Sequence, residues 1–151
     1  MHNIVISDTS SLILFDKIQE FELLRKVYKS IITTPEIAEE FGDNLPNWIQ
    51  IVETKDKKYQ ELIELQVDKG EASAITLAKE TENVILLLDD LKARKLAAKL
   101  NLKYTGVLGV FHKAKQVGII TEVKPLIEKL QQTNFRIAEN VIQELLRLNN
   151  E

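Results

Sequence analysis

The sequence contains no cysteine, which excludes disulfide bonds and zinc sites ligated by thiolates. Histidine is scarce too, since His2 and His112 are the only two, so any metal site must take mostly oxygen ligands. Oxygen ligands favour Mg²⁺ or Mn²⁺. No apolar run approaches the roughly 20 residues of a membrane-spanning helix, and no basic segment precedes the first strand-like residues. We therefore expect a soluble, cytoplasmic protein without a membrane partner.

The 151 residues are 44% hydrophobic, which is typical of one globular domain that buries roughly two-thirds of its unfolded surface. No repeat, low-complexity tract or linker divides residues 1–151, so we expect a single domain. The net charge of −3 conceals a division along the chain. Residues 1–90 carry 9 Lys/Arg against 18 Asp/Glu, whereas residues 91–136 carry 10 against 2. This division suits a phosphate-backbone binder with an anionic metal site, although solvated helix faces also vary in charge by chance.

Short apolar runs alternate with segments of helical periodicity along the chain. The expected strands are residues 3–7, 31–33, 84–88 and 102–105, with 48–52 as an edge strand or an extended connection. The expected helices are residues 12–27, 35–41, 56–67, 71–80, 90–100, 107–117, about 122–132 and 137–148, with breaks at Gly42, Gly70 and Gly118. This alternation predicts an α/β fold around a parallel sheet with right-handed crossovers. The C-terminal helices, about residues 122–149, suit packing on the domain or an interface.

Four carboxylate sites fall at expected strand ends or helix starts. Asp8 follows the first strand, and Asp89 and Asp90 follow the most strand-like run of the chain, VILLL. Ligands of open parallel sheets bind at the carboxyl ends of the strands, which makes these aspartates candidate site residues. The alternative is that they cap the following helices, and one of Asp89 and Asp90 could cap while the other faces the site. Ser10 and Ser11 could orient the Asp8 carboxylate or serve only the turn.

Glu71 is expected on the buried face of its helix. It shares the i, i+3, i+4 and i+7 positions with Ala74, Ile75 and Ala78, and a charge on such a face needs a partner or a site. The alternative is a first-turn glutamate that the helix dipole stabilises by about 0.3–1 kcal/mol. The helix dipole explains why a glutamate stands in the first turn, but it does not explain why this glutamate stands on the buried face.

Glu39 and Glu40 compete for one place in the same set. A rotation of 100° per residue puts Glu40 about 60° from Ile37 on the core side of the helix, and Glu39 about 100° from Ala38. Glu40 is therefore the favoured site residue. The alternative is that both are solvated helix charges.

A cluster of these carboxylates would be unstable by itself. Two unit charges about 5 Å apart repel by roughly 3 kcal/mol at an effective dielectric of 20, so cations or protons must neutralise the cluster. A divalent ion would do so, and it would also activate a water for attack on a phosphate. The expected metal ligands are all carboxylates: Asp8, Glu40, Glu71, Asp89 and Asp90.

The chain resembles the PIN domain, in the branch near the VapC-like toxins of bacterial and archaeal toxin–antitoxin systems. The resemblance rests on a strand ending in Asp-Thr-Ser, then TPEIAEEF, GEASAITLA and LLLDDLKARKLA. The tail, beginning YTGVLGVFHKAKQVGII, is similar to a subgroup described as nucleic-acid-binding PIN proteins. The resemblance implies a three-layer α/β/α fold, Mg²⁺ or Mn²⁺ and endonucleolytic cleavage of RNA. The apolar C-terminal helices suit packing in the core, and they could also join two copies as a homodimer or receive a cognate antitoxin.

The resemblance also assigns roles residue by residue. Asp8 matches the first-strand aspartate of the family, and Ser10 matches the small hydroxyl residue two positions later. Glu40, with Glu39 as rival, matches the acid after the second strand. Glu71 stands where many members have aspartate, and Asp90, with Asp89 as rival, matches the last acid. The implied catalytic set is Asp8, Glu40, Glu71 and Asp90.

Two departures from the toxin pattern bear on activity. The third acid is Glu71 rather than aspartate, and the last site reads Leu-Asp-Asp where toxins commonly carry Thr-x-Asp. A haloacid-dehalogenase-type phosphatase would need an aspartate at Ser10, and a receiver domain would need its acidic pair after the first strand. The open alternative is a non-catalytic nucleic-acid or protein-binding module on the same fold.

The basic segment supplies candidate contacts to nucleic acid. Lys92, Arg94, Lys95 and Lys99 fall on one expected helix, and Lys/Arg provide most sequence-independent affinity for phosphates. The alternative is a solvated helix face. A lone histidine such as His112 is usually a surface or packed residue rather than a catalytic one.

Overall fold

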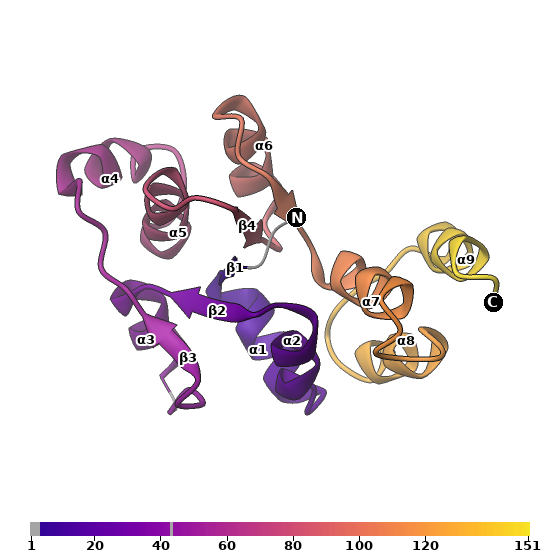
Figure 1. Ribbon diagram of the computed structural model, residues 1–151. Coiled ribbons are helices and arrows are strands. Elements are labelled where there is room, and N and C mark those ends of the chain that lie inside the picture. Colours follow the sequence, from indigo (N-terminus) through magenta and orange to yellow (C-terminus); the bar gives the residue numbers. More distant parts are fainter. Residues whose placement is uncertain (1–3, 43) are drawn as a thin grey trace.

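The computed structural model describes residues 4–42 and 44–151, and Figure 1 shows a central sheet with helices around it. The strands are β1 (Ile4–Ser7), β2 (Ser30–Thr33), β3 (Ile49–Ile51), β4 (Val84–Leu87) and β5 (Tyr104–Thr105). The helices are α1 (Thr9–Lys17), α2 (Phe21–Val27), α3 (Pro35–Phe41), α4 (Lys57–Ile63), α5 (Lys69–Lys79), α6 (Leu91–Lys99), α7 (Val107–Gln116), α8 (Lys124–Gln131) and α9 (Glu139–Leu148). The predicted α/β fold is confirmed. Asn3, which was expected to begin the first strand, lies outside the described residues.

The five strands are parallel and lie in the order β3-β2-β1-β4-β5. From β1 the chain moves outward to β2 and β3, then returns across the sheet to β4 and β5. Right-handed crossovers therefore place α1 and α2 on one side of the sheet and α5 and α6 on the other, as Figure 1 shows. The strand order reverses between β1 and β4, and ligands bind at such a switch point in open α/β sheets.

The inner strands are apolar because both faces of the sheet are covered. Val5 and Ile6 of β1 are fully buried, as are Leu86 and Leu87 of β4. The register pairs Ser7 with Leu87, so β1 and β4 end side by side. The residues that follow these two strands are therefore neighbours in space.

The single helix expected over residues 12–27 is wrong, because the chain turns between α1 and α2. Gln19 adopts a positive φ of 57°, and the N–H of Glu20 donates to the carbonyl of Phe15 at 2.9 Å. The N–H of Gln19 also donates to the carbonyl of Asp16, which completes a Schellman ending of α1. Helices usually end in this way at glycine, so glutamine at this position gave no signal in the sequence.

Two other boundaries differ from expectation around Gly70. The helix expected over residues 56–67 ends at Ile63, and Gly70 lies in the first turn of α5 instead of breaking the chain. The expected stop at Gly42 is confirmed, with φ 83° at this residue. α3 begins after Thr34, whose hydroxyl accepts from the N–H of Ile37 and so caps the helix.

The C-terminal helices pack on the rest of the chain. α8 buries Leu126, Ile127 and Leu130. The Glu151 carboxylate accepts from the N–H groups of Val123 and Lys124, at 2.8 and 3.0 Å, and so caps α8. Among the helices of the described residues, none is long and apolar enough to cross a bilayer.

Candidate functional site

Asp8 lies at the carboxyl end of β1 with only 1% of its surface exposed. Its Oδ1 accepts from the N–H of Ser11 at 2.9 Å, and its Oδ2 accepts from the N–H of Asp89 at 2.9 Å. Burial raises the pKa of the Asp8 carboxyl, although the hydrogen bonds from Asp89 and Ser11 act to lower it. Asp8 therefore caps α1 and, at the same time, joins the ends of β1 and β4.

Glu71 lies half-buried in the first turn of α5, a helix that packs against β1, β4, α3, α4 and α6. Ala74, Ile75 and Ala78 are buried as expected, but every residue from 72 to 78 is buried as well. Helical periodicity therefore does not single out Glu71. Its place at the start of a surrounded helix, facing the strand ends, is what brings it near other acids.

The electrostatics of Glu71 show which carboxylates converge. Burial, the largest cause, and the like charges of Asp8, Asp68, Asp90 and Glu40 together raise the pKa of Glu71 to about 7. The other three acids of the implied catalytic set, Asp8, Glu40 and Asp90, thus all act on Glu71. Sequence order alone separates them by tens of residues.

Of the two rivals on α3, Glu40 is the one whose charge acts on Glu71. Its Oε1 accepts from the Thr9 hydroxyl of α1 at 3.1 Å. The same carboxylate lies over Gly70, where a Cβ atom would come within 2.0 Å of Oε1. Glu39 is exposed beside it. The missing side chain of Gly70 thus leaves room for Glu40 at the start of α5.

Replacing Gly70 by alanine is expected to displace Glu40. Alanine should favour the helix by up to about 1 kcal/mol, so the protein should keep or gain stability. The displaced carboxylate should lower Mn²⁺ affinity by about 10-fold or more, as loss of orientation does at metal sites. Calorimetric titration with Mn²⁺ and thermal unfolding would measure both effects.

Gly109→Ala offers a matched control for this variant. A Cβ at Gly109 would come within 2.2 Å of the Thr105 hydroxyl, so the change has a similar steric consequence in another helix, α7. Mn²⁺ affinity should fall only for Gly70→Ala. Equal affinities of both variants and the wild type would contradict the role given to Gly70.

The two aspartates after β4 have different contacts. Asp90 caps α6, with Oδ2 accepting from the N–H of Ala93 at 2.9 Å, and its charge acts on Glu71. The N–H of Asp89 holds Asp8, and the charge of Asp89 raises the pKa of Asp8. Asp90 is therefore both a helix cap and a neighbour of Glu71, while Asp89 faces Asp8.

Asp68 is an acid of this cluster that sequence reasoning missed. With Glu64, Glu71 and Asp90 it lines an open hollow of about 390 Å³. It occupies the N-cap position of α5 without a side-chain cap bond. Its spacing of three residues before Glu71 was the available signal, because residues at i and i+3 lie on the same side of a helix.

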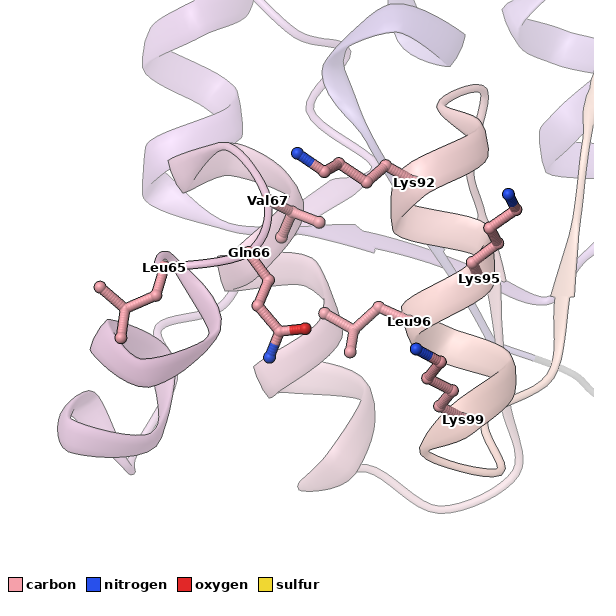
Figure 2. A pocket seen from close by; sticks show the side chains of 7 residues that line it. All are labelled: Leu65, Gln66, Val67, Lys92, Lys95, Leu96 and Lys99. Carbon is pink, nitrogen blue, oxygen red and sulfur yellow. The ribbon is translucent and has the colours of Figure 1, made fainter.

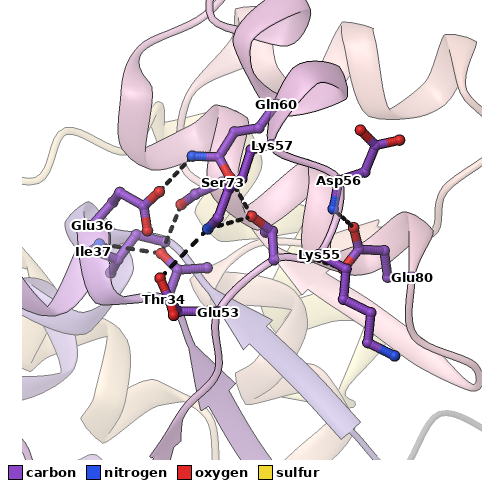
Figure 3. A network of polar contacts seen from close by, with 11 residues as sticks. Thr34, Glu36, Ile37, Glu53, Lys55, Asp56, Lys57, Gln60, Ser73 and Glu80 are labelled. Carbon is purple, nitrogen blue, oxygen red and sulfur yellow. Dashed lines mark hydrogen bonds and ion pairs between the residues drawn. The ribbon is translucent and has the colours of Figure 1, made fainter.

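A polar network fixes the helix that carries Glu40 against the helix that carries Glu71 (Figure 3). The hydroxyls of Thr34 and Ser73 are 2.6 Å apart, and the Ser73 hydroxyl donates to the carbonyl of Gly70 at 2.7 Å. The amide of Gln60 donates to the Glu36 carboxylate. Since Thr34 and Ser73 are fully buried, the start of α3 is held in one position relative to α5.

The cluster fits a divalent cation by its chemistry. Within residues 4–42 and 44–151, no three Asp, Glu or His side chains lie close enough, as they stand, to hold one ion. The donors are nevertheless all oxygen, and burial together with the like charges of the neighbouring acids raises the pKa of Glu71. The Ser11 hydroxyl beside Asp8 is buried without a hydrogen-bond partner in the described chain. The residues that would hold the ion are Asp8, Glu40, Glu71 and Asp90.

Two residues named beside the acids have contacts of their own. Of the two serines that could orient Asp8, Ser10 is exposed, and Ser11 holds the Asp8 carboxylate through its backbone N–H. Arg94 turns into the fold: its Nε donates to the carbonyl of Leu88 at 2.8 Å, and its guanidinium lies 5.9 Å from the ring centre of Tyr104. Arg94 therefore links α6 to the end of β4.

The remaining basic candidates and His112 have distinct surroundings. Lys92, Lys95 and Lys99 are exposed on α6. His112 is half-buried on α7, with Nδ1 3.1 Å from the side-chain oxygen of Asn149, which follows α9. This contact suits the expected packed histidine.

Comparison with known families agrees with this arrangement. Residues 4–151 match the sequence model of a family described as a PIN domain. No curated protein sequence matches the chain. The family match spans the parallel sheet and all the acids that converge beside it. The chain therefore belongs to the PIN domain family, whose members are generally nucleases.

Proposed function

We propose that this chain is a Mg²⁺- or Mn²⁺-dependent endoribonuclease that hydrolyses phosphodiester bonds of single-stranded RNA. The observation that carries the proposal is the convergence of separate carboxylates on Glu71, whose pKa they help to raise to about 7. Such repulsion is relieved when a cation binds. Because PIN domains are generally nucleases that use divalent metals, cleavage of a phosphodiester is the reaction that suits this site.

Each residue of the site has its own role in the proposed cleavage. A bound divalent ion supplies an activated water and neutralises charge on the phosphate. Asp8 offers a carboxylate preorganised by the N–H groups of Ser11 and Asp89. Glu71, with a pKa of about 7, holds a proton near neutral pH when no cation is bound and releases it when one binds. Thr9 orients Glu40.

We extend the proposal to a toxin with a cognate antitoxin and to association of two copies. The support for the toxin is the resemblance of the four acidic motifs to the VapC-like branch. The support for association of two copies is the apolar character of the C-terminal helices. Expression of the chain alone should arrest growth, and Glu71→Gln should not. Growth arrest that persists in Glu71→Gln, or no arrest at all, would count against the toxin role.

A non-catalytic binding module is the second candidate. It is favoured by one observation: no three acidic or histidine side chains of the described ranges share a metal-binding position as they stand. Incubation of labelled RNA with Mg²⁺, with Mn²⁺ and with EDTA separates the two candidates. Cleavage that needs the metal supports the nuclease, and binding without cleavage supports the module.

The pair Glu40→Gln and Glu39→Gln tests which glutamate of α3 serves the site. Both variants remove one exposed charge from the same helix. Glu40→Gln should slow metal-dependent cleavage by at least about 10-fold, because it removes a charge that acts on Glu71 and a partner of Thr9. Glu39→Gln should cleave at the wild-type rate. The reverse order would transfer the role to Glu39.

A further inference from the structure

Three lysines of α6 form one wall of an open hollow beside the acid cluster. Lys92, Lys95 and Lys99 occupy positions i, i+3 and i+7, so they follow one side of the helix over roughly 10 Å. Figure 2 shows them on α6, across from the turn of residues 65–67. The hollow between these two walls has a volume of about 350 Å³.

The three lysines of this wall form no ion pair within the described residues. Lys115 and Lys129, by contrast, each pair with a glutamate. Three like charges on one face of a helix are stabilised by an anion that offers several charges at short intervals.

The hollow is continuous with the acid cluster. The second hollow, which Asp68, Glu71 and Asp90 line, shares residues 65–67 and Lys92 with the first. A chain that lies along the lysines therefore reaches the carboxylates directly. Lys92 stands at the boundary, between the basic wall and the acids.

Apolar side chains line the hollow beside the lysines. Leu65, on the turn across from α6, has 82% of its surface exposed, whereas Val67 of the same turn and Leu96 of α6 are buried. Exposed leucine beside lysine suits a ligand with phosphates on one side and flat apolar groups on the other. A nucleic-acid single strand has this character, because its unstacked bases are free to lie on side chains.

We propose that this hollow binds the phosphodiester backbone of a single strand and leads it to the acid cluster. Lys92, Lys95 and Lys99 contact the phosphates, and Leu65 contacts a base. The inference deepens the proposed function and rests on it for the reaction. Phosphate contacts position a strand without reading its sequence, so the binding should depend on salt and not on base identity.

The test is binding of labelled oligo(U), about 12 nucleotides long, in EDTA, where metal-dependent cleavage is off. Fluorescence anisotropy at several salt concentrations gives the slope of log affinity against log salt. Replacing Lys92, Lys95 and Lys99 together by glutamine should lower that slope by about 2, because each phosphate contact on a single strand contributes about 0.7. Affinity at low salt should fall by at least about 10-fold.

A matched triple variant removes the same charge elsewhere. Lys17, Lys26 and Lys29 are exposed lysines of α1, α2 and the segment before β2, and their replacement by glutamine should leave the slope nearly unchanged. Equal losses in the two triple variants, or no RNA binding by the wild type, would overturn the inference. So would displacement of the RNA by polyglutamate at equal charge concentration, because the hollow would then take an acidic protein segment.

The binding test and the cleavage test can reject the hollow and the nuclease independently of each other. Lysine-dependent binding without metal-dependent cleavage keeps the hollow as a strand-binding surface and rejects the proposed nuclease. Cleavage at the wild-type rate and salt dependence in the α6 triple variant keeps the nuclease and rejects the hollow.

Discussion

Replacing Asp8 by asparagine is expected to lower Mg²⁺- or Mn²⁺-dependent RNA cleavage by at least about 100-fold while the protein remains folded. The change removes one negative charge from the end of β1 and keeps the shape of the side chain. Groups that only orient a metal ligand are worth about 10–100-fold, so loss of a proposed ligand should cost no less. Cleavage of labelled RNA in both metals would measure the effect.

Stability must be measured beside activity for this variant. Both Asp8 oxygens accept backbone N–H groups, from Ser11 and Asp89, and asparagine has only one acceptor oxygen. One N–H therefore loses its partner, at a cost of about 1–3 kcal/mol. Alanine would remove both acceptors and the cap of α1, so asparagine is the better choice. Thermal unfolding should show a cooperative transition at a lower temperature.

Asp56→Asn is the matched control. Asp56 caps α4 in the same way, with Oδ1 accepting from the N–H of Tyr59 at 3.0 Å, and its charge is not among those that act on Glu71. This variant should cleave RNA at the wild-type rate. If Asp8→Asn also cleaves at that rate while folded, Asp8 has no part in the reaction and the proposed nuclease site is wrong.

The strand-end aspartates could be predicted from sequence because local signals determine their positions. A short apolar run ends at Ser7 and another at Leu88, and a parallel sheet brings such ends to one edge. The neighbouring placement of β1 and β4, which is expected for two such strands, is confirmed by their parallel pairing. The hydrogen bond between Asp8 and Asp89 joins residues 81 positions apart, and no local pattern encodes it.

The places that sequence reasoning missed depend on tertiary contacts. Glycine is unfavourable in helices, which predicts a break at Gly70, but Gly70 lies within α5 and leaves space for Glu40. The charge of Arg94 predicts a contact to nucleic acid, and sequence gives no sign that its Nε donates to the carbonyl of Leu88. Helical periodicity predicts a buried face for Glu71, whereas every residue from 72 to 78 is buried. The acids around Glu71, and not its position in the helical repeat, distinguish it from other glutamates.

Glu71→Gln is expected to remove the pH dependence of stability that Glu71 contributes. The pKa of Glu71 is about 7 in the folded chain and 4.5 ordinarily, so the folded state binds its proton more tightly than the unfolded state. The free energy of unfolding that this group contributes is therefore highest below pH 4.5 and falls as pH rises through 7. One proton gives a slope of at most about 1.4 kcal/mol per pH unit, and less for a half-buried group.

Urea unfolding in EDTA between about pH 5 and pH 8 would measure this contribution. The wild type should lose stability over that range relative to Glu71→Gln, because glutamine carries no charge to repel Asp8, Asp90 and Glu40. Glu82→Gln, a change at an exposed glutamate between α5 and β4, should follow the wild type. Parallel curves for all three proteins would show that Glu71 does not have the raised pKa.

Adding Mg²⁺ or Mn²⁺ should invert the effect of the Glu71 charge on the stability of the wild type at alkaline pH. Carboxylates must be ionised to bind the ion, so metal stabilisation should grow from about pH 5 to pH 8, reaching about 2.7 kcal/mol when the ion is at 100 times its dissociation constant. Glu71→Gln has one fewer charge and should gain much less at every pH. Without metal, therefore, the glutamate makes the folded chain less stable at alkaline pH, and with metal the same charge makes it more stable. Such a reversal is expected of a residue kept for binding a cation. Equal metal stabilisation of both proteins would show that the cation binds elsewhere.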